Sequence, residues 1–157
     1  KPHATEYNAD GTTPATSKDH VIGCTDGTST YFEHETGLNQ IKEGATTAIA
    51  ASIESGDFDI GQQGLEGDGE FMMKIRRVIP DFLSQTGDAV ITLNLRDFPN
   101  ETQASSSLGP FTITSGTKKI DTRARARSIS LKVANTSTSQ FWRLGTFRLD
   151  IQPDGRR

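Results

Sequence analysis

The feature that most constrains the fold is a two-residue alternation of side chains in the last third of the chain. From Arg123 to Val133, the odd-numbered positions are first arginines and then aliphatic residues, and the even-numbered positions are mostly Ala and Ser. A period of two is that of a β-strand, whose successive side chains point to opposite faces of a sheet. We therefore predict a strand over residues 123–134 with one face that is cationic at its start and buried at its end.

Similar alternations between turn residues predict about eight strands in all. In the last of them the apolar positions change from even to odd, which predicts a β-bulge at Gly145. A helix is the alternative for the Ala-rich stretch Thr46–Ser55, but its Thr and Ile residues favour a strand. The other strands are predicted over Thr28–His34, Thr46–Ser55, Glu70–Pro80, Asp88–Arg96, Pro110–Ser115, Thr117–Thr122 and Gln140–Ile151, with polar turns or loops at 38–45, 61–69 and 102–108.

The composition agrees with an all-β fold. Hydrophobic residues make up only 32% of the chain, which contains 20 Thr, 13 Ser and 15 Gly. Abundant Thr and Gly are typical of many short strands and turns, and no amphipathic helix longer than two turns is evident. We expect an antiparallel β-sandwich, jelly-roll-like, as the terminal domain of a larger subunit. A core this thin also favours oligomerisation, because neighbouring subunits then bury further surface.

The sandwich is predicted to occupy residues 45–157, and residues 1–44 to form an extension or the remnant of a preceding β domain. The period-two positions predict the core. The predicted core residues are Phe71, Met73, Ile75, Ile91, Leu93, Leu95, Ile129, Leu131, Val133, Trp142, Phe147 and Leu149.

Charge is distributed unevenly along the chain, whose formal net charge is -3. Residues 1–70 carry 3 basic and 13 acidic side chains, whereas residues 118–157 carry 10 basic and 3 acidic ones. Such a polarity has three interpretations: the two parts pack together in one fold, they meet between subunits, or the basic part faces nucleic acid.

No catalytic, metal-binding or cofactor-binding site is predicted. The three histidines, His3, His20 and His34, do not stand at a metal-ligand spacing, and Asp57/Asp59 and Asp81/Asp88 are interpreted as solvated turn residues rather than paired acids or calcium ligands. The single cysteine, Cys24, excludes an internal disulfide. No segment approaches the roughly 20 apolar residues of a membrane-spanning helix.

Arg123, Arg125 and Arg127 are the candidate interaction residues. Their spacing of about 6.6–6.8 Å along one strand face is of the order of the distance between phosphates in DNA. No cluster of aromatic residues lies beside them to stack bases. Ion pairing with the acidic first half or with a neighbouring subunit is therefore favoured over contact with DNA.

Five segments in fixed order resemble the carboxyl-terminal region of the tail nozzle, or distal tail-tube, proteins of podoviruses, the short-tailed bacteriophages. Tyr31–Gly37 also looks like the segment that precedes this region, so the likeness covers about residues 29–157. The five segments are Glu54–Gly61, Glu70–Phe82, Leu95–Pro99, Arg123–Val133 and Trp142–Arg157.

The resemblance implies a non-enzymatic virion structural protein located in a phage tail. It implies a homo-oligomer in the form of a hexameric ring, contacts with other tail proteins such as the adaptor and the fibres, and transient passage of DNA through the ring. The alternative is a carbohydrate- or receptor-binding β-sandwich of a phage adhesin, which needs exposed aromatic side chains. A depolymerase-like enzyme is a third class, which no motif supports.

Overall fold

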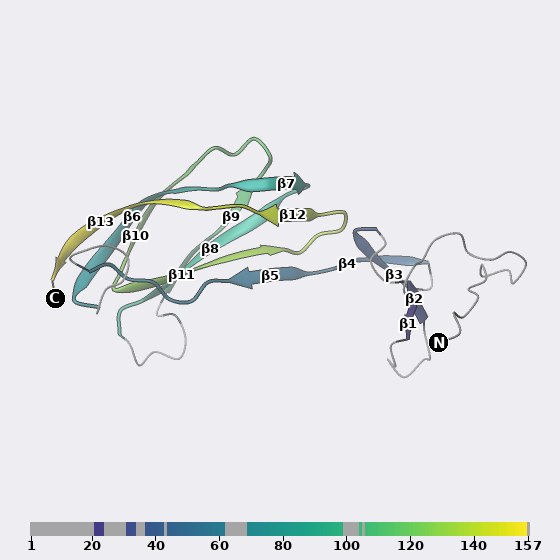
Figure 1. Ribbon diagram of the computed structural model, residues 1–157, viewed down its shortest axis with the longest axis horizontal. Helices are drawn as coiled ribbons and strands as arrows, with labels where there is room; N and C mark the ends of the chain where they lie inside the picture. Colours follow the sequence, from purple (N-terminus) through teal and green to yellow (C-terminus); the bar gives the residue numbers. More distant parts are fainter. Residues whose placement is uncertain are drawn as a thin grey trace, which may run out of the picture. The chain divides into compact units, whose positions relative to one another are not determined.

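A computed structural model describes residues 21–23, 31–33, 37–42, 44–61, 69–98, 104 and 106–156 (Figure 1). The chain forms two compact units, Lys1–Gly37 and Leu38–Arg157. In the first unit, β1 (Val21–Gly23) pairs with β2 (Tyr31–Glu33). The strands of the second unit are β3 (Asn39–Lys42), β4 (Ala45–Ala48), β5 (Ala51–Glu54), β6 (Phe71–Ile79), β7 (Phe82–Thr86), β8 (Ala89–Arg96), β9 (Ser106–Ile113), β10 (Ile120–Ala126), β11 (Ser128–Asn135), β12 (Phe141–Leu144) and β13 (Arg148–Arg156).

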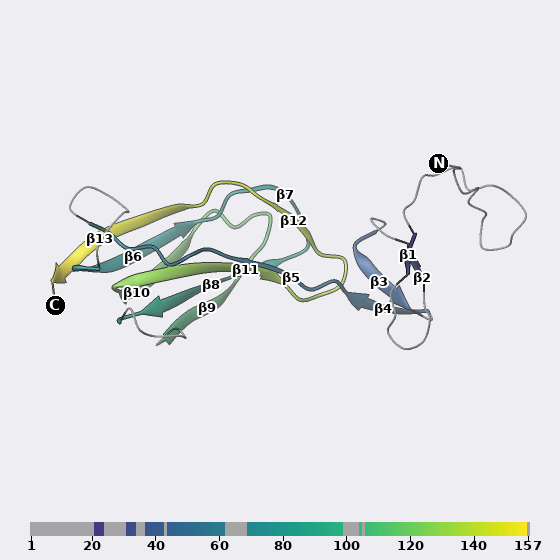
Figure 2. The same cartoon turned by 60° about the horizontal axis from the view of Figure 1, so that its bottom comes forward.

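The fold is all-β, as predicted, and every strand pairing among the described residues is antiparallel. A four-stranded sheet has the order β5-β11-β8-β9, and its strands lie side by side in Figure 2. A three-stranded sheet has the order β10-β6-β13. The pairs β12-β7 and β3-β4 complete the second unit. No helix in the described part of the chain is long and apolar enough to cross a membrane.

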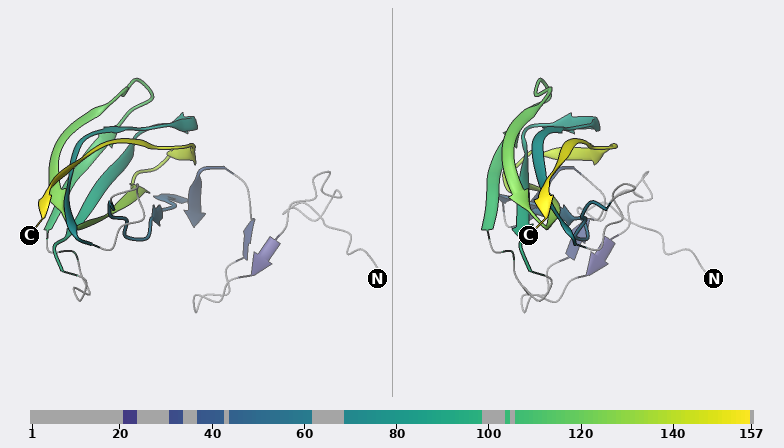
Figure 3. Two further views of the ribbon diagram at one scale, coloured as in Figure 1. Left: turned by 60° about the vertical axis from the view of Figure 1, so that its left-hand side comes forward. Right: turned by 90° about the vertical axis from the view of Figure 1, so that its left-hand side faces the viewer.

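The two larger sheets bury their inner faces in one hydrophobic cluster, which is the arrangement of a β-sandwich (Figure 3). Met73, Ile75 and Val78 of β6 are fully buried in it, opposite Ile91 and Leu93 of β8. Eight of the predicted core residues are buried in this cluster, and Phe71, Trp142, Phe147 and Leu149 are partly buried against it. Buried residues that the sequence analysis did not select are Ile60, Met72, Val78, Ala89, Ile113, Ala124 and Ala126.

The strand predicted over residues 123–134 is in fact two strands in different sheets. β10 pairs with β6 and β11 pairs with β8, and the chain crosses from one sheet to the other at Arg127. The odd-numbered side chains keep the same side of the chain through the crossing. In β10 that side faces solvent, so Arg123 and Arg125 are exposed. In β11 it faces the core, so Ile129 is buried. The change from cationic to aliphatic side chains therefore marks the crossing.

The prediction for β6 was wrong after Ile75. Strict alternation places Arg77 on the apolar face and Val78 on the other, yet Val78 is fully buried and both Arg76 and Arg77 lie outside the core. β13 pairs with the residues on either side of Arg76 through two adjacent residues of its own. Arg76 is therefore the extra residue of a β-bulge, which returns Val78 to the inner face. The Thr122 hydroxyl on β10 donates a hydrogen bond of 2.7 Å to the carbonyl of Ile75 beside this bulge.

The bulge predicted at Gly145 is a three-residue break between β12 and β13 instead. It lies against the break between β6 and β7, because the Gly145 N–H donates to the Asp81 carbonyl at 2.8 Å. A Cβ on Gly145 would stand 2.9 Å from that carbonyl oxygen. The predicted reversal of side-chain phase is present, since Leu144 and Phe147 both pack on the core.

Several predicted boundaries also differ. Thr46–Ser55 is interrupted at Ile49 and Ala50, and the predicted turn at 38–45 contains β3, which pairs with β4. The predicted loop at 102–108 includes the start of β9, and β7 had no counterpart in the sequence analysis. β13 continues past Pro153. Proline has no N–H to donate to a neighbouring strand, and an edge strand such as β13 tolerates it because one of its sides has no neighbour in the sheet.

Candidate functional site

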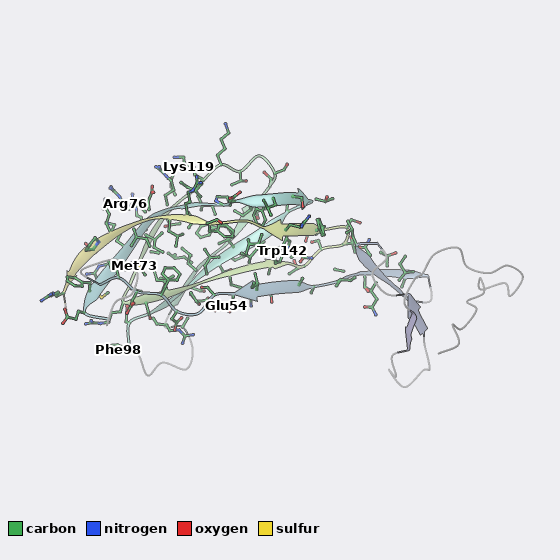
Figure 4. All side chains as sticks on the ribbon, viewed as in Figure 1. Glu54, Met73, Arg76, Phe98, Lys119 and Trp142 are labelled. Atoms are coloured by element: carbon green, nitrogen blue, oxygen red, sulfur yellow. The ribbon has the colours of Figure 1, made fainter. Side chains whose placement is uncertain are left out.

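The outer side of β10-β6-β13 carries a concentration of cationic side chains, and we call it the basic face. Figure 4 shows Arg76 and Lys119 projecting from this side, whereas Met73 lies in the interior. The bulge at Arg76 is central to it, because it adds one more outward arginine to the middle strand. The basic face includes a depression of about 670 Å³ whose charged lining residues are Lys74, Arg76, Arg77, Arg123, Asp121 and Asp150.

On one part of this face, around Arg77, the positive charges are neutralised by neighbouring carboxylates. The Arg77 Nε lies 2.9 Å from Asp121 Oδ1 on β10, and its Nη1 lies 3.5 Å from Asp150 Oδ2 on β13. Lys119 adds a second contact to Asp121, at 2.8 Å. The hydrogen bonds from Lys119 and Arg77 hold the pKa of Asp121 below its usual value, and those with Asp121 raise the pKa of Arg77. Arg77 is thus held between two carboxylates, Asp121 on one side and Asp150 on the other.

The positive charges of Arg76 and Arg123, beside it, are not neutralised in the described part of the chain. Within the described residues, neither Arg76 nor Arg123 forms an ion pair or a side-chain hydrogen bond, and both are exposed. Lys74 lies beside them in the depression, and its charge contributes to lowering the pKa of Asp154. The depression therefore combines a fixed Arg77 with two guanidinium groups that are available to an external anion.

The structure separates the three predicted arginines. Arg123 lies at the depression, while Arg125 reaches across β6 to bind the carboxylate of Asp154 at 2.5 Å and so lowers its pKa. Arg127 is half-buried at the crossing, where its Nη1 donates to the carbonyl of Gly69 at 2.6 Å. Arg123 and Arg125 thus share the basic face, and Arg127 holds the crossing instead.

The outer side of β5-β11-β8-β9 has a different character, and we call it the polar face. Its centre is Glu54, whose Oε1 accepts hydrogen bonds from Ser130 Oγ at 2.7 Å and Asn94 Nδ2 at 2.6 Å. These bonds lower the pKa of the Glu54 carboxyl. Asp57 pairs with Arg96 at 2.9 Å on the same sheet. The acidic groups of the polar face, Glu54 and Asp57, are therefore used within the molecule.

The edge of the four-stranded sheet is a second unusual surface. β5 is an edge strand, all four of its residues are exposed, and the exposed fraction of Ile53 is 50%. Ile49, just before it, is 51% exposed. We call Ile49 and Ile53 the apolar edge. An open edge strand with exposed aliphatic residues favours pairing with another chain.

Trp142 is part of the molecule's interior packing. Its ring meets Phe82 edge-on at a centroid distance of 6.5 Å, and Phe82 meets Phe147 in the same way at 5.7 Å. The Trp142 Nε1 donates to Oδ1 of the buried Asn135 at 3.1 Å. Both the ring and its polar atom are thus engaged in the fold.

Within the described ranges, no three His, Cys, Asp or Glu residues gather into a group that could hold a metal ion. His3, His20, His34 and Cys24 lie outside the described residues. Two of the predicted acids have separate roles: the Asp57 carboxylate binds Arg96, and the Asp81 carboxylate accepts the Thr146 N–H at 3.4 Å.

Sequence reasoning missed Lys74, Arg76 and Arg77 as members of the site. One signal could have identified them: two adjacent arginines follow Ile75 and precede Val78. Both aliphatic side chains reach the core only if an extra residue shifts the phase between them. A comparison with protein-family models finds no match to this chain, and no curated protein matches it either.

Proposed function

We propose that this chain is a virion structural module, a component of the short tail tube or nozzle of a short-tailed bacteriophage that forms part of the DNA-ejection channel. The observation that carries the proposal is the apolar edge, which a neighbouring subunit must cover if the chain is not to expose an unpaired strand. A tubular assembly of identical subunits supplies such a neighbour on each side of every copy.

The resemblance to tail nozzle proteins supports the same proposal from the sequence. Its five segments fall on structural elements of both sheets: the end of β5, β6, the end of β8, the crossing from β10 to β11, and β12 with β13. The likeness therefore extends over the framework of the domain rather than over one surface loop. These elements also carry the basic face.

The test is the native mass of the chain in solution, with electron microscopy of the particles. We expect a ring of six copies. A particle that stays monomeric over a wide concentration range would contradict the proposal. Replacing Ile49 and Ile53 by Thr should move assembly to higher protein concentration. Leu83→Thr is the matched control, because Leu83 is 73% exposed but lies on β7, away from the apolar edge.

A carbohydrate-binding adhesin module is the alternative, and it predicts a different result. Sugar rings stack on exposed aromatic faces. The only Trp of the chain instead packs on Phe82 and binds Asn135, and the exposed aromatic rings of the described residues are Phe98 and Phe141, at 65% and 40%. A monomer that binds glycans in an array would favour the adhesin. A ring that binds none would favour the tail.

A further inference from the structure

We propose that the depression on the basic face receives carboxylates from the acidic first seventy residues of a second copy of this chain. The inference rests on the proposed assembly role and names the contact that would join two subunits. It makes the contact heterologous, with the basic face of one copy against the acidic part of the next. Contacts of this kind generate a ring when the rotation between copies closes.

The geometry of the depression is that of an incomplete ion-pair site. Arg77 is held between Asp121 and Asp150, so its position is fixed from two sides. Arg76 stands next to it because of the bulge, and Arg123 comes from the neighbouring strand. The structure thus prearranges three guanidinium groups around one depression and supplies carboxylates for only one of them. Guanidinium groups bind carboxylates through paired, parallel hydrogen bonds.

Charge identifies the occupant. The four cations of the depression exceed its two carboxylates, and the other acids of the basic face already bind Arg125 and Arg156. Residues 1–70 have 13 acidic and 3 basic side chains. Of these acids, Asp57 and Glu70 already pair with Arg96 and Arg156, and Glu54 is hydrogen-bonded. The remaining surplus is of the sign and chemistry that the depression lacks.

Nucleic acid fits these observations less well. The chain has a formal net charge of -3, which repels a polyanion at long range. Non-specific DNA binding depends on the number of phosphates neutralised, and proteins that bind tightly make about 6–10 such contacts. Two unpaired arginines in a single depression offer far fewer, whereas a contact repeated around a ring acts at every subunit boundary.

The first experiment reverses the two unpaired charges. Arg76→Glu with Arg123→Glu should raise the concentration at which the chain assembles by about tenfold or more, because like charges then meet across the contact. The matched control is Arg143→Glu with Lys118→Glu, which makes the same change in net charge at exposed positions outside the depression. The control should assemble within about twofold of the parent. Circular dichroism establishes that both variants are folded.

The second experiment identifies the partner directly. A carbodiimide condenses the Lys74 amine with a carboxylate in contact with it, and mixing ¹⁴N- and ¹⁵N-labelled chains shows whether the two came from different copies. We expect links between copies from Lys74 to acids within residues 1–70. Links confined to one copy, or to acids beyond residue 70, would overturn the inference.

The outcomes separate this contact from the proposed function. A parent ring with an equally stable Arg76/Arg123 variant would leave the tail proposal standing and reject the contact. A parent that stays monomeric would reject the tail proposal, and the absence of cross-links between copies would reject the contact as well. Unchanged assembly together with a several-fold loss of affinity for a short DNA duplex would assign the depression to nucleic acid instead.

Discussion

The basic face and the polar face lie on opposite sides of one core, and they use their charged side chains differently. On the polar face, Glu54 and Asp57 find partners on the same sheet. On the basic face, Arg76 and Arg123 have none among the described residues, although Arg77 beside Arg76 is paired with two carboxylates. The inner faces of the sheets are alike, so the difference comes only from the outward positions. The acids of the polar face are satisfied within the molecule, whereas two arginines of the basic face remain available to another molecule.

The largest losses of stability are expected at the inner face, where substitutions in the two sheets should cost similar free energies of unfolding. Ile75→Ala and Leu93→Ala each remove a fully buried side chain, from β6 and β8 respectively, and should lower the free energy of unfolding by about 2–5 kcal/mol. The outward changes Arg76→Ala and Thr92→Ala should cost about 1 kcal/mol or less. Urea unfolding measures all four.

The comparison would break if Arg76→Ala were as costly as Ile75→Ala. The unpaired arginine would then stabilise the folded monomer, and its charge would be engaged within the molecule as Glu54 and Asp57 are on the polar face.

Trp142 tests whether the shared core extends beyond the two larger sheets. Trp142→Ala removes a partly buried ring and should cost about 2–4 kcal/mol, less than the roughly 3–5 kcal/mol of a fully buried aromatic residue. Trp142→Phe keeps a ring against Phe82 but leaves Oδ1 of the buried Asn135 without its donor, at a cost of about 1–3 kcal/mol. Thermal unfolding of both variants measures the two contributions, and a Trp142→Phe variant as stable as the parent would show that the hydrogen bond is dispensable.

The strands that could be predicted are those whose side-chain period is uninterrupted. The alternation of Ile91, Leu93 and Leu95 gave the inner face of β8 directly, and all three are buried. Such a pattern needs no knowledge of the partner strands, since the period alone separates the two faces.

The failures occur where tertiary pairing changes the period. The bulge at Arg76 depends on how β6 pairs with β13, and the crossing at Arg127 depends on which sheet each half of the run joins. β7 shows no alternation, because its half-buried residues, Phe82 and Gln85, are three positions apart, so a period of two could not predict it. The basic depression combines residues of three strands, so it follows from the topology and not from any one segment.

Gly145 tests the contact between the break joining β12 to β13 and the break joining β6 to β7. Gly145→Ala places a methyl group 2.9 Å from the Asp81 carbonyl oxygen and should cost about 1–3 kcal/mol, because two backbone segments must separate. Gly56→Ala is the control, since a Cβ there meets nothing within 4 Å. Denaturant unfolding compares them, and equal stabilities would show that the contact between the two breaks is loose.

Glu54 tests the claim that the polar face satisfies its own charges. Hydrogen bonds from Ser130 and Asn94 lower the pKa of Glu54 in the folded state below the ordinary value of 4.5. A carboxyl with a lowered folded pKa stabilises the fold at pH values above its unfolded pKa, and that contribution is lost as the pH falls through the folded pKa. Because Glu54 is largely exposed, we expect about 1 kcal/mol or less after solvent screening. The parent should therefore be slightly more stable than Glu54→Gln at pH 7, and the difference should shrink progressively as the pH falls below 4.5. Urea titrations of both proteins from pH 7 to pH 3 measure this, and a difference independent of pH would mean that the ionised carboxylate contributes nothing beyond an amide in its place.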